Sequence, residues 1–188
     1  KSPKIIEDLV PNKLSVSTIT QVLKNLLQEG ITLRDNRSII DNLLAESVKT
    51  KDANQLTALI RPHLGRIIVQ DIISVNEELP IITLEQPLEQ LLNNSIQNDS
   101  STNDVFLEPK LIESIVASVS IEKQNAEERG NPAVMVVSPK IRPWLSRILR
   151  QRLGNLSVLA YTEIPEDQEI RVIGRVGIQD EQQNQVAA

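Results

Sequence analysis

Residues 133–176 read AVMVVSPKIRPWLSRILRQRLGNLSVLAYTEIPEDQEIRVIGRV, and this stretch decides the fold class. Residues 133–137 are apolar at every position, as in a strand that is covered on both faces within a parallel sheet. Ser138 and Pro139 are the residue types of a helix N-cap and first helical position, and apolar residues then recur at helical spacing until Gly154. Two β-rich runs follow, separated by the polar residues 165–169. We therefore expect a strand, a right-handed crossover helix, a strand and a hairpin.

The residues before this stretch extend the α/β pattern. Residues 79–84 predict a short strand, which Pro80 favours at a sheet edge or at the start of the strand. Apolar residues at 88, 91, 92 and 96 predict a helix, and the polar run 97–104 predicts a loop. A long helix begins at Pro109 and is ended by residues 130–132.

The first 75 residues contain helical patterns and no strand pattern. A short helix is expected at 2–9. Ser15 is the N-cap of a second helix, whose apolar residues recur with a period of 3.6 until Gly30.

Two further helices follow in this part of the chain. One begins at Asp35 or Asn36, and the next begins at Asp52, where Gln55 is placed to complete a capping box. Pro62 removes a backbone donor and clashes with the preceding turn, so we expect a kink or a break there.

These patterns predict an α+β or α/β protein of two subdomains. Residues 1–75 are an all-helical subdomain, residues 79–177 a small α/β subdomain, and residues 178–188 a polar tail. The expected order in the second subdomain is β-α-α-β-α-β-β, with a mixed sheet.

The composition excludes several classes of function. The chain of 188 residues is 40% hydrophobic and 24% charged, which is typical of a globular protein. Aromatic residues make up only 2% and the net charge is −5, so binding of nucleic acid through base stacking or a general positive charge is disfavoured. The absence of cysteine excludes disulfides and thiolate chemistry, and a single histidine leaves carboxylates as the remaining metal ligands. We expect no cofactor.

No apolar run approaches the roughly 18 residues that a membrane span requires. The chain begins at Lys1, and its one methionine is Met135. We therefore expect a piece of a longer protein, whose preceding part can include a membrane portion.

The basic residues of the helix at 139–153 have three interpretations. Lys140, Arg142, Arg147, Arg150 and Arg152 are either a solvated helix face, a docking surface for an acidic protein, or a nucleic-acid contact. Trp144 flanks the apolar face of this helix, so we expect it to be partly exposed and available as an interface anchor, with Arg147 and Arg150 beside it.

Three other sets of polar residues could have either a structural or a chemical role. Ser138 lies at a strand-to-helix turn, but the glycines of a nucleophile elbow or a phosphate loop are missing, which favours a cap. His63 lacks acidic neighbours in the sequence and is interpreted as a structural or surface residue. Glu163, Glu166 and Asp167 fit no calcium loop or acid/base pair, so a solvated turn is expected.

The cluster Arg34, Asp35, Asn36 and Arg37 joins two helices. Intramolecular capping and ion pairing explain it most simply, and contact with a second subunit is the alternative. Arg34, Asp35 and Arg37 are therefore candidate interface residues, together with Trp144, Arg147 and Arg150.

Four segments resemble one family, the flagellar and type III secretion export-gate proteins (FlhA-like). They are IIEDLVPNKLSVSTITQVLKNLLQEGITLRDNRSII, LTALIRPHLGRIIVQDI, LPIITLEQPLEQLL and VMVVSPKIRPWLSRILRQRLGNLSVLAYTEIP. The resemblance extends from about Lys4 to Val176, and the combination of LRDNRSII with the last segment is specific.

The resemblance implies the C-terminal cytoplasmic region of such a protein. Family members have membrane helices followed by cytoplasmic subdomains, which form a nonameric ring and dock export chaperones, substrates and other export components at the cytoplasmic face of the bacterial inner membrane. The helical subdomain is the main ring-forming part. A non-catalytic scaffold for protein export is therefore the first hypothesis.

Two other classes of function are the alternatives. One is a nucleic-acid-binding module that uses the basic helix 139–153, and the other is an α/β enzyme with a site near Ser138 at the carboxyl ends of the strands.

Overall fold

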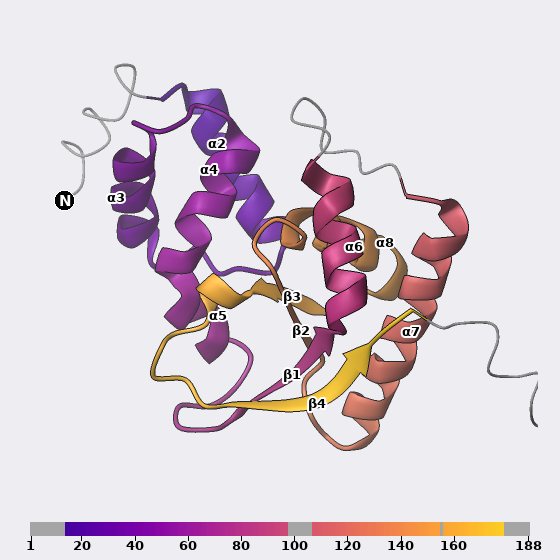
Figure 1. Ribbon diagram of the computed structural model, residues 1–188. Helices are drawn as coiled ribbons and strands as arrows, with labels where there is room; N and C mark the ends of the chain where they lie inside the picture. Colours follow the sequence, from indigo (N-terminus) through magenta and orange to yellow (C-terminus); the bar gives the residue numbers. More distant parts are fainter. Residues whose placement is uncertain (1–13, 98–106, 155, 179–188) are drawn as a thin grey trace, which may run out of the picture. The chain divides into compact units, whose positions relative to one another are not determined.

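The computed structural model describes residues 14–97, 107–154 and 156–178 (Figure 1). These residues form two compact units, one made of 14–77 with 162–168 and the other made of the described residues of 78–161 with 169–178. The first is the helical unit and the second the α/β unit. The expected helix at 2–9, most of the polar loop 97–104 and the tail after 178 lie outside the described residues.

Capping side chains begin the helices of the helical unit. Ser15 Oγ accepts the Thr18 N–H at 3.0 Å, and Asp52 Oδ1 accepts the Gln55 N–H at 2.8 Å, as expected of N-caps. The capping box at Asp52 is incomplete, because the Gln55 side chain accepts the hydroxyl of Thr50 instead. The helices are α2 (Val16–Gln28), α3 (Asn36–Glu46), α4 (Ala53–Ile60) and α5 (Gly65–Gln70).

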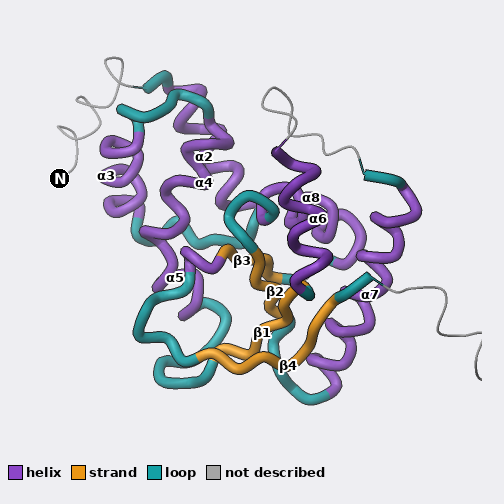
Figure 2. The backbone as a smooth tube through the Cα atoms, in the orientation of Figure 1, coloured by secondary structure: helices purple, strands orange, loops and turns teal. Residues whose placement is uncertain are grey.

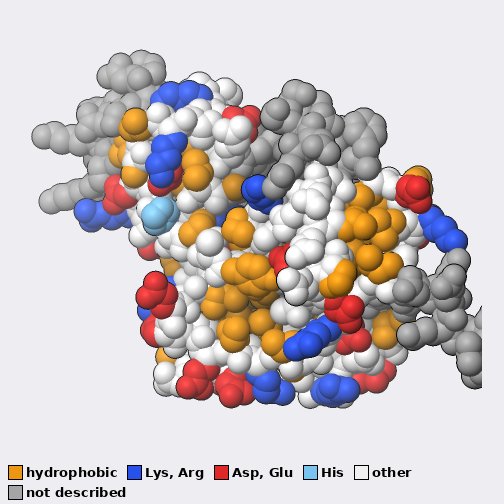
Figure 3. Space-filling model, in the orientation of Figure 1, with side chains coloured by type: hydrophobic (Ala, Val, Ile, Leu, Met, Phe, Trp, Pro, Cys, Tyr) orange, Lys and Arg blue, Asp and Glu red, His pale blue; other side chains and the backbone are white. Residues whose placement is uncertain are grey.

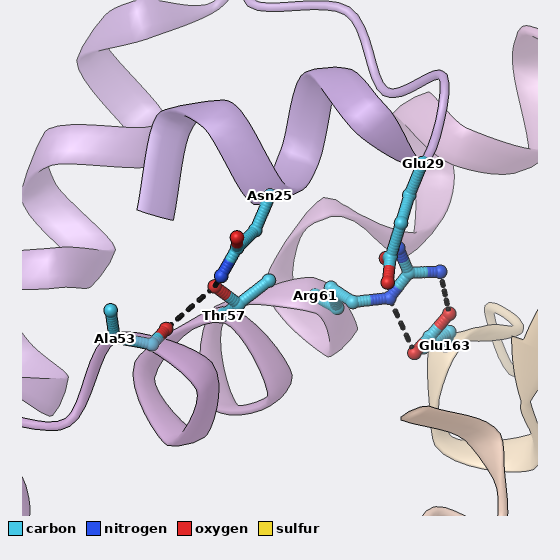
Figure 4. A network of polar contacts seen from close by, with 6 residues as sticks. All are labelled: Asn25, Glu29, Ala53, Thr57, Arg61 and Glu163. Carbon is cyan, nitrogen blue, oxygen red and sulfur yellow. Dashed lines mark hydrogen bonds and ion pairs between the residues drawn. The ribbon is translucent and has the colours of Figure 1, made fainter. Parts of the chain in front are cut away.

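Pro62 interrupts the fourth helix as expected. The chain tightens into the 3₁₀ helix η1 (Arg61–Leu64) between α4 and α5. Helix α4 packs against both α2 and α3, and the core between them is aliphatic, with Leu26, Leu43 and Ile60 at 0% exposure. Asn25 links α2 to α4 by donating to Thr57 Oγ1 at 3.1 Å (Figure 4).

In the described residues, the α/β unit has four strands and three helices in the order that the sequence predicts. They are β1 (Leu79–Leu84), α6 (Gln86–Gln97), α7 (Pro109–Glu128), β2 (Val134–Val137), α8 (Arg142–Leu153), β3 (Ser157–Ala160) and β4 (Ile170–Val176). The 3₁₀ helix η2 (Tyr161–Glu163) follows β3 and continues into the segment 162–168 of the helical unit. The strands lie side by side in Figure 2.

The sheet is parallel throughout, so the expected mixed sheet and hairpin are wrong. Its strand order is β3-β2-β1-β4, and β4 pairs with β1 rather than with β3. The turn that suggested a hairpin exists, since the Gln168 N–H donates to the Pro165 carbonyl at 3.0 Å. Its flanking strands do not pair because residues 162–168 belong to the helical unit.

Of two prolines, one is placed as expected and one is not. β1 is an inner strand, and Pro80 lies at its start, as its second residue, which is one of the two positions expected. Helix α8 begins at Arg142, with Pro143 in its first turn, so Ser138 and Pro139 precede the helix in a turn instead of capping it.

The core of the α/β unit lies between the sheet and its helices. Side chains on one face of the sheet, among them Ile82 and Met135, pack against Leu88, Leu92 and Leu145 of the helices. Figure 3 shows apolar side chains reaching the surface along α6 and α7, where partly buried residues of this core are found.

Leu92 provides a test of this core. Leu92→Ala removes a side chain with 0% exposure and is expected to destabilise the α/β unit by about 2–5 kcal/mol, because it leaves a cavity. Ile121→Ala, at a position 52% exposed, is the control and should change stability by less than about 0.5 kcal/mol. Urea unfolding followed by the fluorescence of the single tryptophan, which is part of the same core, measures both. Equal effects would contradict the packing described.

Candidate functional site

The cluster at the start of α3 separates into a cap and exposed arginines. Asp35 accepts the Ser38 N–H at 3.1 Å and the Ser38 hydroxyl at 2.6 Å. These bonds lower the pKa of Asp35, with a smaller contribution from the charge of Arg37. Arg34 and Arg37 are exposed, and Arg37 makes a long ion pair of 3.8 Å with Asp41. Asp35 is therefore a structural cap, while the two arginines present positive charge to solvent.

The second group of candidates does not form the expected surface. Trp144 is 5% exposed and belongs to the core of the α/β unit, so the expectation of a partly exposed tryptophan is wrong. The reason is a wide apolar face on α8, which places Trp144 among Ile141, Leu145 and Leu149. Arg147 and Arg150 are exposed on the same helix. Arg142, counted among the basic residues of this helix, is buried at 3% exposure.

Side chains meet at the carboxyl ends of the parallel strands, where open α/β sheets often bind ligands. The Tyr161 hydroxyl donates to the carboxylate of Glu89 at 3.1 Å, and the Ser138 N–H donates to the same carboxylate at 3.0 Å. Ser138 Oγ donates to Asn93 Oδ1 at 2.9 Å. An amide oxygen is not a general base, so this contact does not activate Ser138 as a nucleophile.

Tyr161 is held in its neutral form by this arrangement. Burial, followed by the negative charge and hydrogen bond of Glu89, raises its pKa to about 12. The phenol is therefore a donor at neutral pH, and the cluster ties the ends of β2 and β3 to α6.

The chain has one tyrosine, so this pKa is directly measurable. Spectrophotometric titration should find the pKa near 12, and Glu89→Gln should lower it towards 10 because the negative charge is removed. Since the folded-state pKa is raised, the associated stability is complete below pH 10 and is lost between about pH 10 and 12. A wild-type pKa of 10 would contradict the contact with Glu89.

Arg61 forms a buried ionic network that the sequence did not reveal. Its side chain is 2% exposed, and it donates from Nε to Glu163 Oε1 at 2.8 Å and from Nη2 to Glu163 Oε2 at 2.6 Å (Figure 4). Nη1 also pairs with Glu29, which follows α2. Burial alone would lower the pKa of Arg61, but the two carboxylates raise it, so the guanidinium stays charged.

The location of Glu163 corrects an expectation. It was expected in a solvated turn, yet its side chain is 3% exposed because it pairs with Arg61, which lies 102 residues earlier. Asp167 is exposed and makes a bidentate contact of 3.0 Å with Arg66, which lowers its pKa. The segment thus has one buried and one exposed ionic anchor. In the sequence, this pair was indicated only by Arg61, an arginine in the helix that Pro62 interrupts. Its presence there does not identify a partner 102 residues away.

His63 lies at the surface, which is one of the two roles that the sequence indicated. Its side chain is 49% exposed, and Nε2 lies 3.5 Å from Glu46 Oε1. Among the described residues, no group of three or more His, Cys, Asp or Glu side chains is placed to hold a metal ion. No helix in the described ranges is long and apolar enough to cross a membrane.

Removal of the Arg61 charge tests the network. Arg61→Met leaves the buried carboxylate of Glu163 without its partner, and we expect a loss of about 3–5 kcal/mol in the stability of the helical unit. Arg66→Ala, which breaks the exposed pair with Asp167, should cost at most about 1 kcal/mol. Chemical unfolding followed by far-UV circular dichroism compares the two. If both variants are equally mild, the network does not stabilise the unit.

Solved structures share this fold over nearly the whole chain. The nonameric SctV-C of EPEC aligns with a TM-score of 0.80 and 24% identity, covering 92% of this chain and 52% of that one. The CdsV protein of Chlamydia pneumoniae, in the structure of its complex with CdsO, aligns with a TM-score of 0.82 and 20% identity, covering 94% of this chain and 50% of that one. The chain therefore shares the fold of these proteins.

Sequence comparison identifies the family. The chain belongs to the FHIPEP family, whose model matches residues 1–169. It is 37% identical over 175 residues to the flagellar biosynthesis protein FlhA of Salmonella typhimurium, covering 93% of this chain and 25% of that protein. The FlhA protein of Bacillus subtilis is 32% identical over 176 residues, with 94% of this chain and 26% of that protein covered. The chain thus spans about a quarter of the length of these relatives.

Proposed function

We propose that this chain is the terminal part of the cytoplasmic region of a flagellar export gate, a non-catalytic ring component that docks export chaperones, substrates and other export proteins. The intact protein would be anchored in the bacterial inner membrane through a part that is not in this chain. The observation that carries the proposal is identity above 30% to FlhA proteins over more than nine tenths of the chain. The flagellar assignment is favoured over a virulence secretion system because the flagellar biosynthesis relatives are 32–37% identical, whereas SctV-C and CdsV align at only 20–24% identity.

Self-association into a ring is the mode of assembly we propose. A structural relative from EPEC is nonameric, and another from Chlamydia pneumoniae is found in complex with CdsO. A closed ring needs two complementary surfaces on each subunit, because its contacts are heterologous. Ring contacts in this chain are assigned to the helical unit.

Arg34 and Arg37 are the proposed contact residues on that unit. Both are exposed at the start of α3 and neither is held by a short ion pair within the described residues. Asp35 supports them indirectly, because it caps the helix from which Arg37 projects. Arg147 and Arg150 of α8 are proposed as a docking surface for acidic segments of export partners. Trp144 is left out of this surface because it is buried.

Charge removal at α3 tests the ring assignment. Arg34→Ala/Arg37→Ala should raise the midpoint concentration of self-association by about tenfold, which corresponds to the loss of about 1.4 kcal/mol of contact energy. Sedimentation velocity over a concentration series measures the midpoint. Lys24→Ala/Arg129→Ala removes the same charge from exposed positions elsewhere and is the matched control.

Two results would contradict the assignment. A chain that stays monomeric at the highest concentration shows that this part does not self-associate without the rest of the protein. A shift equal to that of the control shows that net charge, rather than the α3 surface, drives assembly.

A further inference from the structure

Residues 162–168 are held by the helical unit at both ends of the segment. Near its start, Glu163 forms two hydrogen bonds of 2.8 and 2.6 Å with Arg61, and both side chains are at most 3% exposed. Near its end, Asp167 makes two contacts of 3.0 Å with Arg66, where both side chains are about two thirds exposed. The spacing of the two carboxylates thus matches that of two arginines on neighbouring turns of η1 and α5.

The backbone of the segment also packs closely against the helical unit, at Gly65. A Cβ built on Gly65 would lie 2.9 Å from the carbonyl carbon of Glu163 and closer still to its oxygen, well inside van der Waals contact. Gly65 has helical backbone angles, so close approach of the segment, rather than an unusual conformation, requires glycine here. Gln168 Nε2 then donates to the Glu77 carbonyl at 2.8 Å.

The conformation of the segment is that of a short bound peptide. It contains a turn closed by the 3.0 Å hydrogen bond from the Gln168 N–H to the Pro165 carbonyl, and no residue from 164 to 168 is in a helix or strand. Ile164 and Pro165 are partly buried, whereas Glu166 is exposed. The helical unit offers this turn a buried arginine (Arg61), a glycine without a side chain (Gly65) and an exposed arginine (Arg66). Such a set is suited to binding a turn that carries two carboxylates.

We propose that α4, η1 and α5 form a binding site for an acidic turn peptide, and that this chain fills the site with its own residues 162–168 as a releasable latch. The ligand class is a peptide with a glutamate for Arg61 and a second carboxylate four residues later for Arg66.

Binding or release of the segment changes how many chain connections restrain the two units. The residues on either side of the segment belong to the α/β unit, so the chain passes between the units at 77–78, at 161–162 and at 168–169. When the segment is bound, three chain crossings restrict the movement of the units. When it is released, only the crossing at 77–78 joins them directly. The buried pair of Glu163 with Arg61 is the strongest of the contacts that hold the segment, since exposed pairs such as that of Arg66 contribute little.

Hydrogen exchange in Glu163→Gln measures release of the latch. In the full chain, the amides of 162–168 should exchange at least tenfold faster than in wild type, while those of β2 are unchanged. Asp167→Asn, which removes the exposed anchor, is the matched control and should change exchange by less than threefold. Unchanged exchange in Glu163→Gln would overturn the latch, as would equal acceleration in β2, which indicates general destabilisation.

A peptide supplied in trans tests the binding site itself. A fluorescein-labelled peptide of residues 160–170, AYTEIPEDQEI, should bind the Glu163→Gln chain at least tenfold more tightly than wild type, because the covalently attached segment occupies the wild-type site at high effective concentration. The same peptide with glutamine in place of its first glutamate should bind at least tenfold more weakly to the Glu163→Gln chain. Absence of binding to this chain, or equal binding of both peptides, would overturn the site.

Gly65→Ala provides an independent variant without a change of charge. Alanine is the better helix former, so helix α5 is not weakened, but its Cβ occupies the position of the Glu163 carbonyl. We expect fast exchange of 162–168 and no binding of the peptide. Tight binding of the peptide to Gly65→Ala would contradict the proposed location.

If the variants do not fold, hydrogen exchange of the wild-type protein tests the latch. The proposal expects 162–168 to exchange as one group, faster than the amides of α2 and α4. Exchange of all three segments only through global unfolding would show that the segment is a fixed part of the core, and would overturn the proposal. This result would leave the proposed export function untouched, because ring assembly is measured separately.

Discussion

The buried guanidinium of Arg61 holds the segment 162–168 on the helical unit. Arg61 is surrounded by carboxylates from two distant positions, Glu29 and Glu163, and a charge with 2% exposure is tolerated only with such partners. The requirement to bring Glu163 to Arg61 takes residues 162–168 out of the α/β unit. The path from β3 to β4 therefore passes through the helical unit, and β4 enters the sheet beside β1.

Local patterns predicted the elements well because their causes are local. The N-caps at Ser15, Asp35 and Asp52 and the break at Pro62 depend on residues a few positions apart. The features at Ser15, Asp52 and Pro62 were predicted from sequence, and Asp35 was one of two alternatives for the start of its helix. The strand pairing was not predictable in this way. Glycine-free polar residues at 165–168 do form a turn, but whether the flanking strands pair depends on a contact made 102 residues away. The resemblance to the export-gate family gave the class of protein, which residue spacing alone did not.

The candidate site residues show the same difference between properties with a local cause and properties that depend on a distant contact. Arg34, Arg37, Arg147 and Arg150 are exposed. A solvated face was one of the interpretations of the basic helix, whereas intramolecular capping and pairing was the simplest explanation of the cluster at 34–37. Trp144 was assigned to the edge of such a face and is buried, because α8 is covered by the core over a wide arc. Arg61 and Gly65 were not identified from sequence, since the properties that distinguish them are a partner and a close backbone approach supplied by Glu163. Surface charge was therefore more predictable than the residues that organise the interior.

The same connectivity sets an order of events during synthesis. Arg61 leaves the ribosome 102 residues before Glu163, and at about 5–20 residues per second its partner follows after roughly 5–20 s. Over the same interval β1 lacks the strand that pairs with it on one side, because β4 is translated after residue 169. Each unit thus depends on a piece that is translated after residue 161, namely 162–168 for the helical unit and β4 for the α/β unit. A polypeptide released before residue 160 would carry in one unit a buried arginine that lacks one of its two carboxylate partners, and in the other an unpaired strand edge, two defects of the kind that chaperones and proteases recognise.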